Sequence, residues 1–459
     1  MGHPRSGGEP RATSPAGPSG PVTRLRAGVG QRRATNTPDR STTGRSPGPV
    51  GRPVRCNSSD LEEERMRTRK IAAVAAGLTL AMTVAACGGE GAGDTGTDTG
   101  TDTGTEETAE EEGGAEEGGL IGVAMPTQTS ERWIADGEAV KAGLEEAGYE
   151  VDLQFAGDDI PVQQQQIDQM ITKGAAALII AAIDGTAISG QLEAAAAAGI
   201  PVISYDRLIR DSENVDFYVT FDNYQVGVQQ ATSLLVGLGI MDAEGNETDV
   251  AGPFNIELFA GSLDDNNAFF FFEGAMSILQ PYIDSGVLVV KSGQTDIEQV
   301  ATLRWQQETA QKRMEDLLTS TYNDGSKVNG VLSPYDGLSR GIITALQNAG
   351  YGPGIDAGMP IVTGQDAEIA SVKLIADGVQ FSTIFKDTRK LAAQAVVAAE
   401  AYLAGEEPEA NDTETYDNGV KVVPSYLLES DIVYADNITE LLVDSGYWSE
   451  AEVESGVAE

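Results

Sequence analysis

The residues best suited to chemistry in this sequence are polar side chains that follow short apolar runs. Carboxylate, guanidinium and similar polar groups can bond neighbouring hydroxyls of a small molecule. The set consists of Asp206 and Arg207 after the run 202–205, Asp264, Asp265, Asn266 and Asn267 after 256–259, Asp336 after 328–333, Gln365 and Asp366 after 361–363 and Lys386 after 381–385. In an open α/β sheet, ligands bind outside the carboxyl ends of the strands. We therefore expect one site assembled from several loops.

A second interpretation of these residues is structural. Short polar side chains at strand ends also cap helices and stabilise turns, because they satisfy free backbone N–H groups. Asp265 and Asn266, which precede Asn267, fit that interpretation best.

Two Arg-Trp pairs add aromatic surface near the same loops. Arg132-Trp133 follows the first expected strand, and Arg304-Trp305 opens an expected helix over 300–319. An indole face matches the apolar C–H face of a pyranose ring. Two tryptophans from opposite lobes could hold such a ring between them; the alternative is that both pack against the core. The aromatic run 269–272 is interpreted as core packing, with lining of the site as the alternative.

Several reaction classes lack the side chains that they need. The one histidine is His3, and the two cysteines, Cys56 and Cys87, fall outside the expected globular region. This removes Ser-His-Asp hydrolysis, His-ligated zinc and a thiol nucleophile, so no metal site is expected. The first strand is followed by no Gly-rich phosphate loop, so no cofactor is expected. Asp206 with Asp366 is the single pair on which an enzyme could be built, and no catalytic residue is predicted.

The length and the net charge of the chain limit the classes of protein to which it can belong. With 459 residues the chain exceeds one ordinary core, so we expect at least two domains. The formal net charge of −41 argues against nucleic acid as a partner, since phosphate contacts need clustered Lys and Arg.

Apolar runs alternate with helix-like stretches from residue 120 to residue 403. This alternation predicts parallel strands with helices on both faces of the sheet. The series is too long for one sheet, so we predict an α/β protein of two doubly wound parallel-sheet lobes joined by a three-segment hinge. The expected lobes are 120–222 plus 387–415, and 223–386 plus 416–446, followed by a tail over 447–459. The turn-rich stretch 412–424 is the expected third break.

The first 119 residues have a different composition. Residues 1–65 are rich in Arg, Pro, Gly and Ser and are interpreted as disordered or as an over-extended gene start, with Met66 as the true beginning. Residues 66–86 carry a basic segment and then an apolar one, which is typical of a secretory signal peptide. Cys87 follows Ala-Ala and is predicted to be lipidated, and 87–119 form a flexible acidic linker.

The globular region resembles a known family over its whole length, residues 120–446. The segments that carry the resemblance are 124–127, 132–134, 204–210, 220–223, 252–259, 264–271, 303–305, 333–337, 364–367 and 385–388. They are similar to the periplasmic sugar-binding proteins of the ribose/xylose-binding class, which have the type I fold. Within that class the multiple-sugar-binding receptors are the most similar.

The resemblance implies a receptor of two lobes, acting as a monomer without a cofactor, that closes on a neutral aldose of the xylose, glucose, galactose or arabinose type. It implies delivery of the sugar to an ABC permease and its ATPase. The implied contact residues are Arg132, Trp133, Asp206, Arg207, Asn267, Arg304, Trp305, Asp336, Asp366 and Lys386. The predicted lipid anchor departs from the family's Gram-negative pattern and fits the outer face of a Gram-positive cell membrane.

Three alternatives follow from the same residues. One is a receptor that presents its closed form to a membrane sensor kinase or chemoreceptor. Another is an enzyme that uses Asp206 and Asp366. The third, the sugar-sensing domain of a repressor, conflicts with the export signal and the missing helix-turn-helix.

Overall fold

A computed structural model describes residues 118–458, which all belong to one compact unit of the chain, residues 105–459. The predicted signal peptide over 66–86, Cys87, residues 1–65 and most of the predicted linker lie outside the described residues. Within residues 118–458, no helix combines the length and the apolar character needed to cross a membrane.

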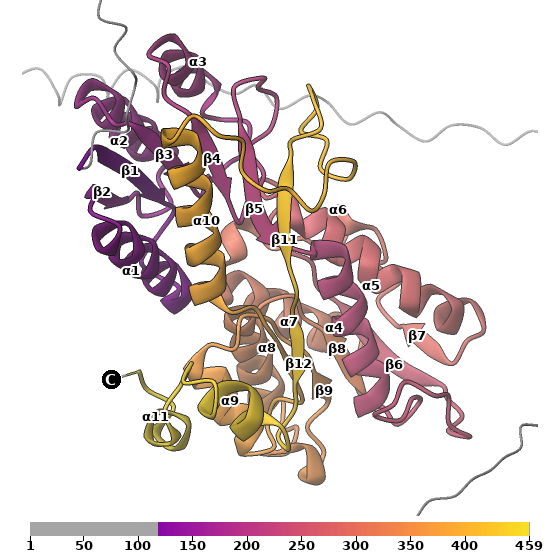
Figure 1. Ribbon diagram of the computed structural model, residues 1–459. Coiled ribbons are helices and arrows are strands. Elements are labelled where there is room, and N and C mark those ends of the chain that lie inside the picture. Colours follow the sequence, from indigo (N-terminus) through magenta and orange to yellow (C-terminus); the bar gives the residue numbers. More distant parts are fainter. Residues whose placement is uncertain (1–117, 459) are drawn as a thin grey trace, which may run out of the picture. The chain divides into compact units, whose positions relative to one another are not determined.

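The first lobe is built on a six-stranded parallel sheet with the order β11-β5-β4-β3-β1-β2 (Figure 1). Its strands are β1 (Leu120–Met125), β2 (Glu150–Phe155), β3 (Ala177–Ile180), β4 (Val202–Tyr205), β5 (Phe217–Phe221) and β11 (Ser425–Leu428). Strand β3 is buried along its whole length, as a central strand covered on both faces requires.

Helices cover both faces of this sheet. The apolar sides of α1 (Glu131–Glu146) and α10 (Thr388–Leu403) form a core with one face. The sides of α2 (Ile160–Thr172) and α3 (Ser189–Ala197) form a second core with the other face. The predicted alternation of strands and helices therefore gives two layers of helices around one sheet.

The second lobe has a four-stranded parallel sheet with the order β7-β6-β8-β9. Its strands are β6 (Phe254–Leu258), β7 (Leu288–Val290), β8 (Gly330–Leu332) and β9 (Ile361–Val362). Helices α4 (Asn223–Gly237) and α5 (Asn267–Asp284) pack on one face, and α7 (Gln307–Ser320) and α8 (Asp336–Asn348) on the other. The predicted fold class, with two parallel-sheet lobes, is confirmed.

A third apolar cluster lies beside this sheet. It joins the antiparallel pair β10 (Thr383–Phe385) and β12 (Asp431–Val433) to helix α9 (Ile369–Ala376). The remaining short elements are α6 (Ile297–Val300), η2 (Leu303–Trp305), η3 (Ile355–Ala357), η4 (Thr439–Val443) and α11 (Glu450–Ser455).

Three chain segments pass between the lobes. One joins β5 to α4 at Asp222, one joins β10 to α10, and one joins β11 to β12. The third differs from the expected break over 412–424, and the assignment of 416–446 to the second lobe is wrong at β11, which pairs with β5 in the first lobe. The turn-rich stretch folds back on the first lobe instead, where Asn418 Nδ2 donates to the carbonyl of Ser212 at 2.7 Å.

The expected helix over 300–319 is also corrected. Helix α7 begins only at Gln307, and the residues before it form the 3₁₀ turn η2. Arg304 and Trp305 have φ of 56° and 54°, which a continuous right-handed helix excludes. The kink places these two side chains on a loop rather than on a helix face.

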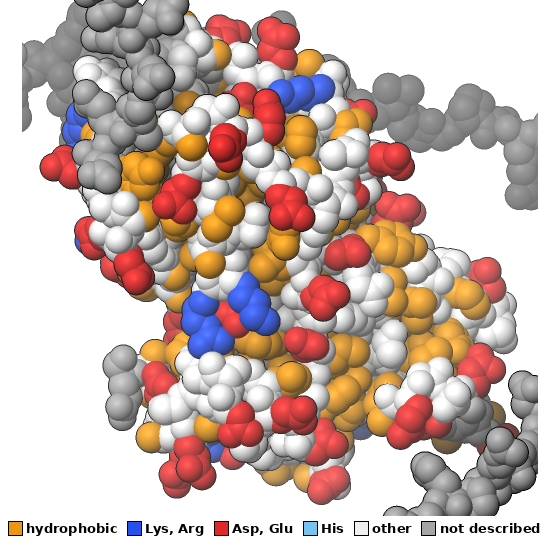
Figure 2. Space-filling view, in the orientation of Figure 1, with side chains coloured by type: hydrophobic (Ala, Val, Ile, Leu, Met, Phe, Trp, Pro, Cys, Tyr) orange, Lys and Arg blue, Asp and Glu red, His pale blue; other side chains and the backbone are white. Residues whose placement is uncertain are grey.

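Figure 2 shows acidic side chains spread over one face of the molecule, with Lys and Arg side chains gathered near the end of α10 that meets the crossovers.

Candidate functional site

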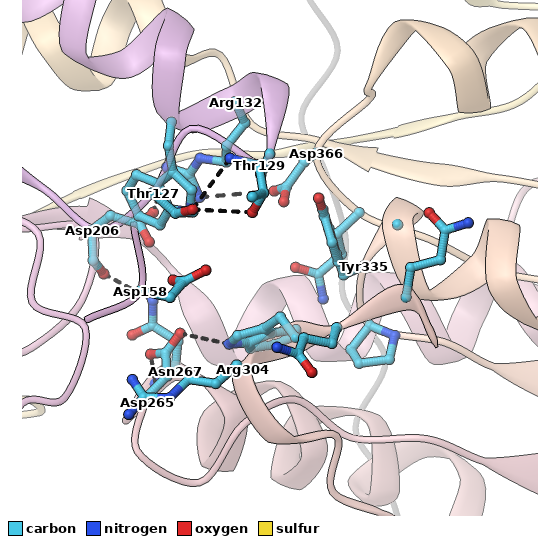
Figure 3. Close-up of a pocket in the computed structure, with 18 of the residues that line it drawn as sticks. Thr127, Thr129, Arg132, Asp158, Asp206, Asp265, Asn267, Arg304, Tyr335 and Asp366 are labelled. Atoms are coloured by element: carbon cyan, nitrogen blue, oxygen red, sulfur yellow. Dashed lines mark hydrogen bonds and ion pairs between the residues drawn. The ribbon is translucent and has the colours of Figure 1, made fainter. Parts of the chain in front are cut away.

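A cavity of about 510 Å³ lies between the two lobes, at the carboxyl ends of their strands. Its volume is in the range of small-molecule sites. Nine of the ten predicted contact residues line it: Arg132, Trp133, Asp206, Arg207, Asn267, Arg304, Trp305, Asp366 and Lys386. Figure 3 shows the labelled members facing a common space, with Asp158 and Asp206 on one side and Tyr335 on the other.

The structure does not bring Asp336 to the cavity wall. Its carboxylate is fully buried and accepts hydrogen bonds from the Glu368 N–H at 3.0 Å, from Gln380 Nε2 at 2.8 Å and from Thr383 Oγ1 at 3.0 Å. Burial, and then the charge of Glu368, raises the pKa of Asp336 well above its usual value. Asp336 thus has a structural role and tethers the loop that carries Asp366, although it caps no helix, since Tyr335 holds the N-cap position of α8.

Arg132 connects the charged groups of the site. Its Nε lies 2.7 Å from Asp136 Oδ2, its Nη2 lies 2.8 Å from Asp206 Oδ2, and its Nη1 lies 3.9 Å from Asp366 Oδ1. Lys386 Nζ reaches the same oxygen of Asp366 at 2.8 Å. Cations and carboxylates from both lobes therefore alternate along the cavity.

Burial and neighbouring charges shift the pKa values of the carboxylates around Arg132. Burial alone would raise the pKa of Asp206, but the charges of Arg132 and Lys386 outweigh it and hold the pKa below its usual value. For Asp136, burial outweighs the attraction of Arg132, so its pKa is raised. Asp136 also accepts a 2.5 Å hydrogen bond from the hydroxyl of Tyr205.

Asp265, expected to be only structural, also lines the cavity. Its Oδ2 lies 3.0 Å from Arg207 Nε and accepts a hydrogen bond from Trp305 Nε1 at 3.2 Å. The neighbouring Asp264 lies 3.3 Å from Arg304 Nε. The loop after β6 thus positions two arginines and one tryptophan of the site.

The two tryptophans have different surroundings. Trp133 is 5% exposed, and the guanidinium carbons of Arg132 and Arg207 lie 4.5 and 5.1 Å from its ring centroid, within cation–π range. Trp305 makes edge contacts with Phe271 at 6.4 Å and with Tyr335 at 6.3 Å between ring centroids. Trp133 supports two arginines, whereas Trp305 presents the more exposed indole to the cavity.

Unusual backbone conformations gather at the cavity. Within residues 118–458, seven non-glycine residues have positive φ, and five of them line the cavity: Asp158, Asp206, Arg304, Trp305 and Asp366. Such conformations cost on the order of 1–3 kcal/mol each and cluster at functional sites, where the surrounding structure holds them. No local sequence pattern predicts these conformations.

Three buried donors at the cavity make no hydrogen bond with the described residues: Gln365 Nε2, Arg304 Nη1 and Arg207 Nε. Arg207 Nε has Asp265 as an ion-pair partner, and Gln365 is only 1% exposed. Because buried polar groups are nearly always paired, these donors indicate a ligand that supplies acceptor oxygens.

Other lining residues, among them Thr127, Asp158 and Tyr335, were missed from the sequence, whereas Gln365 was named among the polar residues at the strand ends. Asp158 follows strand β2, so it lies past the carboxyl end of a strand like the predicted polar residues. Phe271 belongs to the aromatic run assigned to the core; it contributes to both core and cavity. Across residues 118–458, no cluster of three or more His, Cys, Asp or Glu side chains could hold a metal ion.

Two parallel-sheet lobes with a polar cavity between them define a ligand-binding receptor that holds its ligand in an interlobe cleft. The family pattern of the periplasmic binding protein domain matches residues 121–407, and the chain belongs to this family. Its members are binding proteins, which confirms the prediction that the chain is not an enzyme.

Similar proteins agree with this assignment. The multiple sugar-binding periplasmic receptor ChvE of Rhizobium radiobacter is 57% identical over 334 residues, covering 73% of this chain and 92% of that protein. A solute-binding protein of an ABC transporter from Clostridium phytofermentans, solved with bound β-D-glucose, is 47% identical with a TM-score of 0.68, covering 73% of this chain and 99% of that one. A carbohydrate-transporter solute-binding protein from Chloroflexus aurantiacus, in complex with D-glucose, is 40% identical with a TM-score of 0.64, covering 72% and 97%. The predicted family resemblance is confirmed.

Proposed function

We propose that this protein binds a neutral aldose in the interlobe cavity and delivers it to the permease of an ABC importer. The observation that carries the proposal is the lining of the cavity by alternating cations and carboxylates from both lobes, beside an exposed indole. It occurs in a chain 57% identical to a multiple sugar-binding receptor and 47% identical to a protein solved with glucose.

The side chains suit the hydroxyls of a sugar. Carboxylates accept from hydroxyl groups, while guanidinium and amide groups donate to their oxygens. The free donors on Gln365 and Arg304 are matched by sugar oxygens, and Trp305 offers its face to the C–H groups of the ring. A sugar that lacks one hydroxyl leaves a buried group unpaired, at a cost of about 1–3 kcal/mol.

The charge balance favours a neutral sugar. Each of the cavity's cations Arg132, Arg207, Arg304, Arg340 and Lys386 already lies beside a carboxylate. No excess positive charge from these five groups is left for an anionic ligand, whereas neutral hydroxyls can insert into the alternating network without separating bare charges.

Anchoring and partners form the second part of the proposal. The basic and apolar segments of 66–86 and the Ala-Ala before Cys87 support export and lipidation at Cys87. A linker over 87–119 gives the receptor reach from the outer face of the membrane to the permease. The permease and its ATPase are proposed because the solved relative is a component of an ABC transporter.

A binding panel tests the proposal. Calorimetry with pentoses and hexoses, including xylose, glucose, galactose and arabinose, is expected to show tight binding of at least one aldose. Mass spectrometry of the recovered sugar is expected to show no conversion. The absence of binding to every aldose in the panel would rule out the proposed function.

A further inference from the structure

Two helix N-termini meet at the mouth of the cavity, one from each lobe. Helix α1 of the first lobe begins after Ser130, and helix α9 of the second lobe begins after Glu368. Both residues hold the N-cap position, where a polar side chain normally bonds a free N–H of its own helix, yet neither does so. Ser130 Oγ instead donates to Glu368 Oε1 at 2.9 Å, so this bond joins the two lobes.

Glu368 also holds side chains of its own lobe. Its Oε1 accepts from the hydroxyl of Tyr335 at 2.7 Å, and its Oε2 accepts from Arg340 Nη2 at 2.6 Å. Ser130, Tyr335 and Arg340 all line the cavity, while Glu368 does not. Glu368 is only 2% exposed, so its carboxylate is committed to these three partners.

The contact is partly reciprocal. Glu131, the first residue of α1, lies close to Glu368. The N–H of Ile369, the first residue of α9, donates a hydrogen bond to the carboxylate of Glu131. Burial, and then repulsion by Glu368, raises the pKa of Glu131. Glu131 of α1 thus offers its carboxylate to the N-terminus of α9, where the N–H groups and the helix dipole favour it.

We propose that Ser130 and Glu368 form an interlobe latch that stabilises the closed arrangement of the lobes, with Glu368 as a positioning residue. The bond can form only when the lobes are together, because its two partners belong to different lobes. It therefore lowers the free energy of the closed state alone, and a ligand held in the closed cavity is released more slowly. The effect on ligand release rests on the proposed function; the effect on the lobes does not.

Stopped-flow release of a bound aldose from the full chain tests the latch. Ser130→Ala is expected to speed release about ten- to hundredfold, the size of effect for one hydrogen bond to a charged group, with little change in the association rate. Glu368→Ala is expected to have a larger effect, because it also removes the acceptor of Tyr335 and Arg340. The double variant should release the sugar no faster than Glu368→Ala alone, since both changes remove the same bond.

Ser449→Ala is the matched control. Ser449 is also an N-cap serine, but its hydroxyl accepts from the N–H of Glu452 in its own helix α11. Its replacement is expected to lower stability slightly and to leave sugar release unchanged. Equal release rates for Ser130→Ala and the unmodified protein would overturn the latch.

Small-angle scattering of the sugar-free protein gives a second readout. Ser130→Ala is expected to increase the radius of gyration relative to the unmodified protein and to Ser449→Ala, because the open arrangement gains population. An unchanged radius of gyration contradicts the latch even if no aldose binds. Failure of every aldose to bind, with the shift in radius present, contradicts the proposed function alone.

Discussion

At the scale of single residues, Arg132 is the side chain on which the charged part of the site depends. Its three nitrogens face Asp136, Asp206 and Asp366 in three different directions. A planar guanidinium offers five donors in a fixed fork, whereas a lysine ammonium is a compact point charge. Lysine cannot serve the three carboxylates at once from this position.

Replacing Arg132 by Lys is expected to weaken sugar binding at least tenfold and to lower the free energy of unfolding by about 1–3 kcal/mol, because a buried carboxylate loses its donor. Calorimetry and urea unfolding measure the two effects. The matched control is Arg389→Lys, since Arg389 pairs with Asp387 at 2.8 Å from a half-exposed position outside the cavity. Its change in stability should stay within about 1 kcal/mol, and its sugar affinity should not change. Equal losses of affinity in both variants would contradict the role of Arg132.

The lowered pKa of Asp206 predicts a dependence of stability on pH. Its folded pKa is below its unfolded value, so the ionised carboxylate stabilises the fold above the unfolded pKa, near 3.9, and this contribution is lost as the pH falls through the folded pKa. The difference in unfolding free energy between the unmodified protein and Asp206→Asn should therefore be largest near neutral pH. Urea unfolding from pH 7 to pH 3 is expected to show the difference shrinking below about pH 4. A difference that stays constant over this range would disprove the assigned shift.

The strand-end rule led to five of the predicted contact residues that line the cavity, because parallel strands bring their carboxyl ends to one edge whatever their sequence separation. It could not separate Asp206, which faces the cavity, from Asp336, which turns away to bond Glu368, Gln380 and Thr383. Both are buried aspartates after apolar strands, and the direction of a side chain depends on donors that come from elsewhere in the chain.

At the scale of elements, the turn η2 determines how the second lobe presents its indole. Arg304 and Trp305 adopt left-handed φ, and the Arg304 N–H donates to Ser262 Oγ at 2.8 Å. Gly261 lies directly under the indole: a Cβ at Gly261 would meet Cη2 of Trp305 at 2.0 Å. The absence of a side chain at Gly261 is therefore what lets the turn pack against the loop after β6.

Replacing Gly261 by Ala is expected to displace the Trp305 ring and to weaken sugar binding at least tenfold, because the ring cannot keep its position when a contact falls that far inside van der Waals distance. Calorimetry measures the affinity, and tryptophan fluorescence reports the change in environment. Gly190→Ala in helix α3 is the control, since a Cβ there meets nothing within 4 Å. It should leave affinity unchanged and alter the free energy of unfolding by no more than about 1 kcal/mol, in the stabilising direction. Full affinity in Gly261→Ala would refute the dependence on this packing.

The order of strands and helices was predictable, because apolar runs and helical periodicity are local signals. The kink before α7 could not be predicted, because the residues around Arg304 and Trp305 have helix-like spacing. Their φ values are imposed by contacts with Ser262 and Gly261. Strand β11 was also missed, because a four-residue edge strand after a long stretch of turns has too little periodicity to be recognised.

At the scale of the whole molecule, the contacts that join the lobes carry no sequence signal. Ser130 and Glu368 are 238 residues apart, and no local pattern pairs them. The two lobes themselves were predictable from the length of the alternating series, and their relation to a family was predictable from motifs spread over the globular region. Three short chain segments connect the two lobes, and hinge closure requires connections of this kind.

The placement of the molecule in a cell depends on Cys87. If Cys87 is lipidated, the full chain expressed in a Gram-positive host should incorporate an alkyne fatty acid and remain with the membrane fraction, because more than one acyl chain gives stable anchoring. Cys87→Ser should abolish the label and change the fraction in which the receptor is found, while sugar affinity stays the same, since the linker keeps the two functions apart. Cys56→Ser is the control, because Cys56 precedes the predicted signal peptide and should not affect the label. Labelling that persists in Cys87→Ser would assign the anchor to another residue, and sugar uptake that survives without any anchor would show that delivery to the permease does not need one.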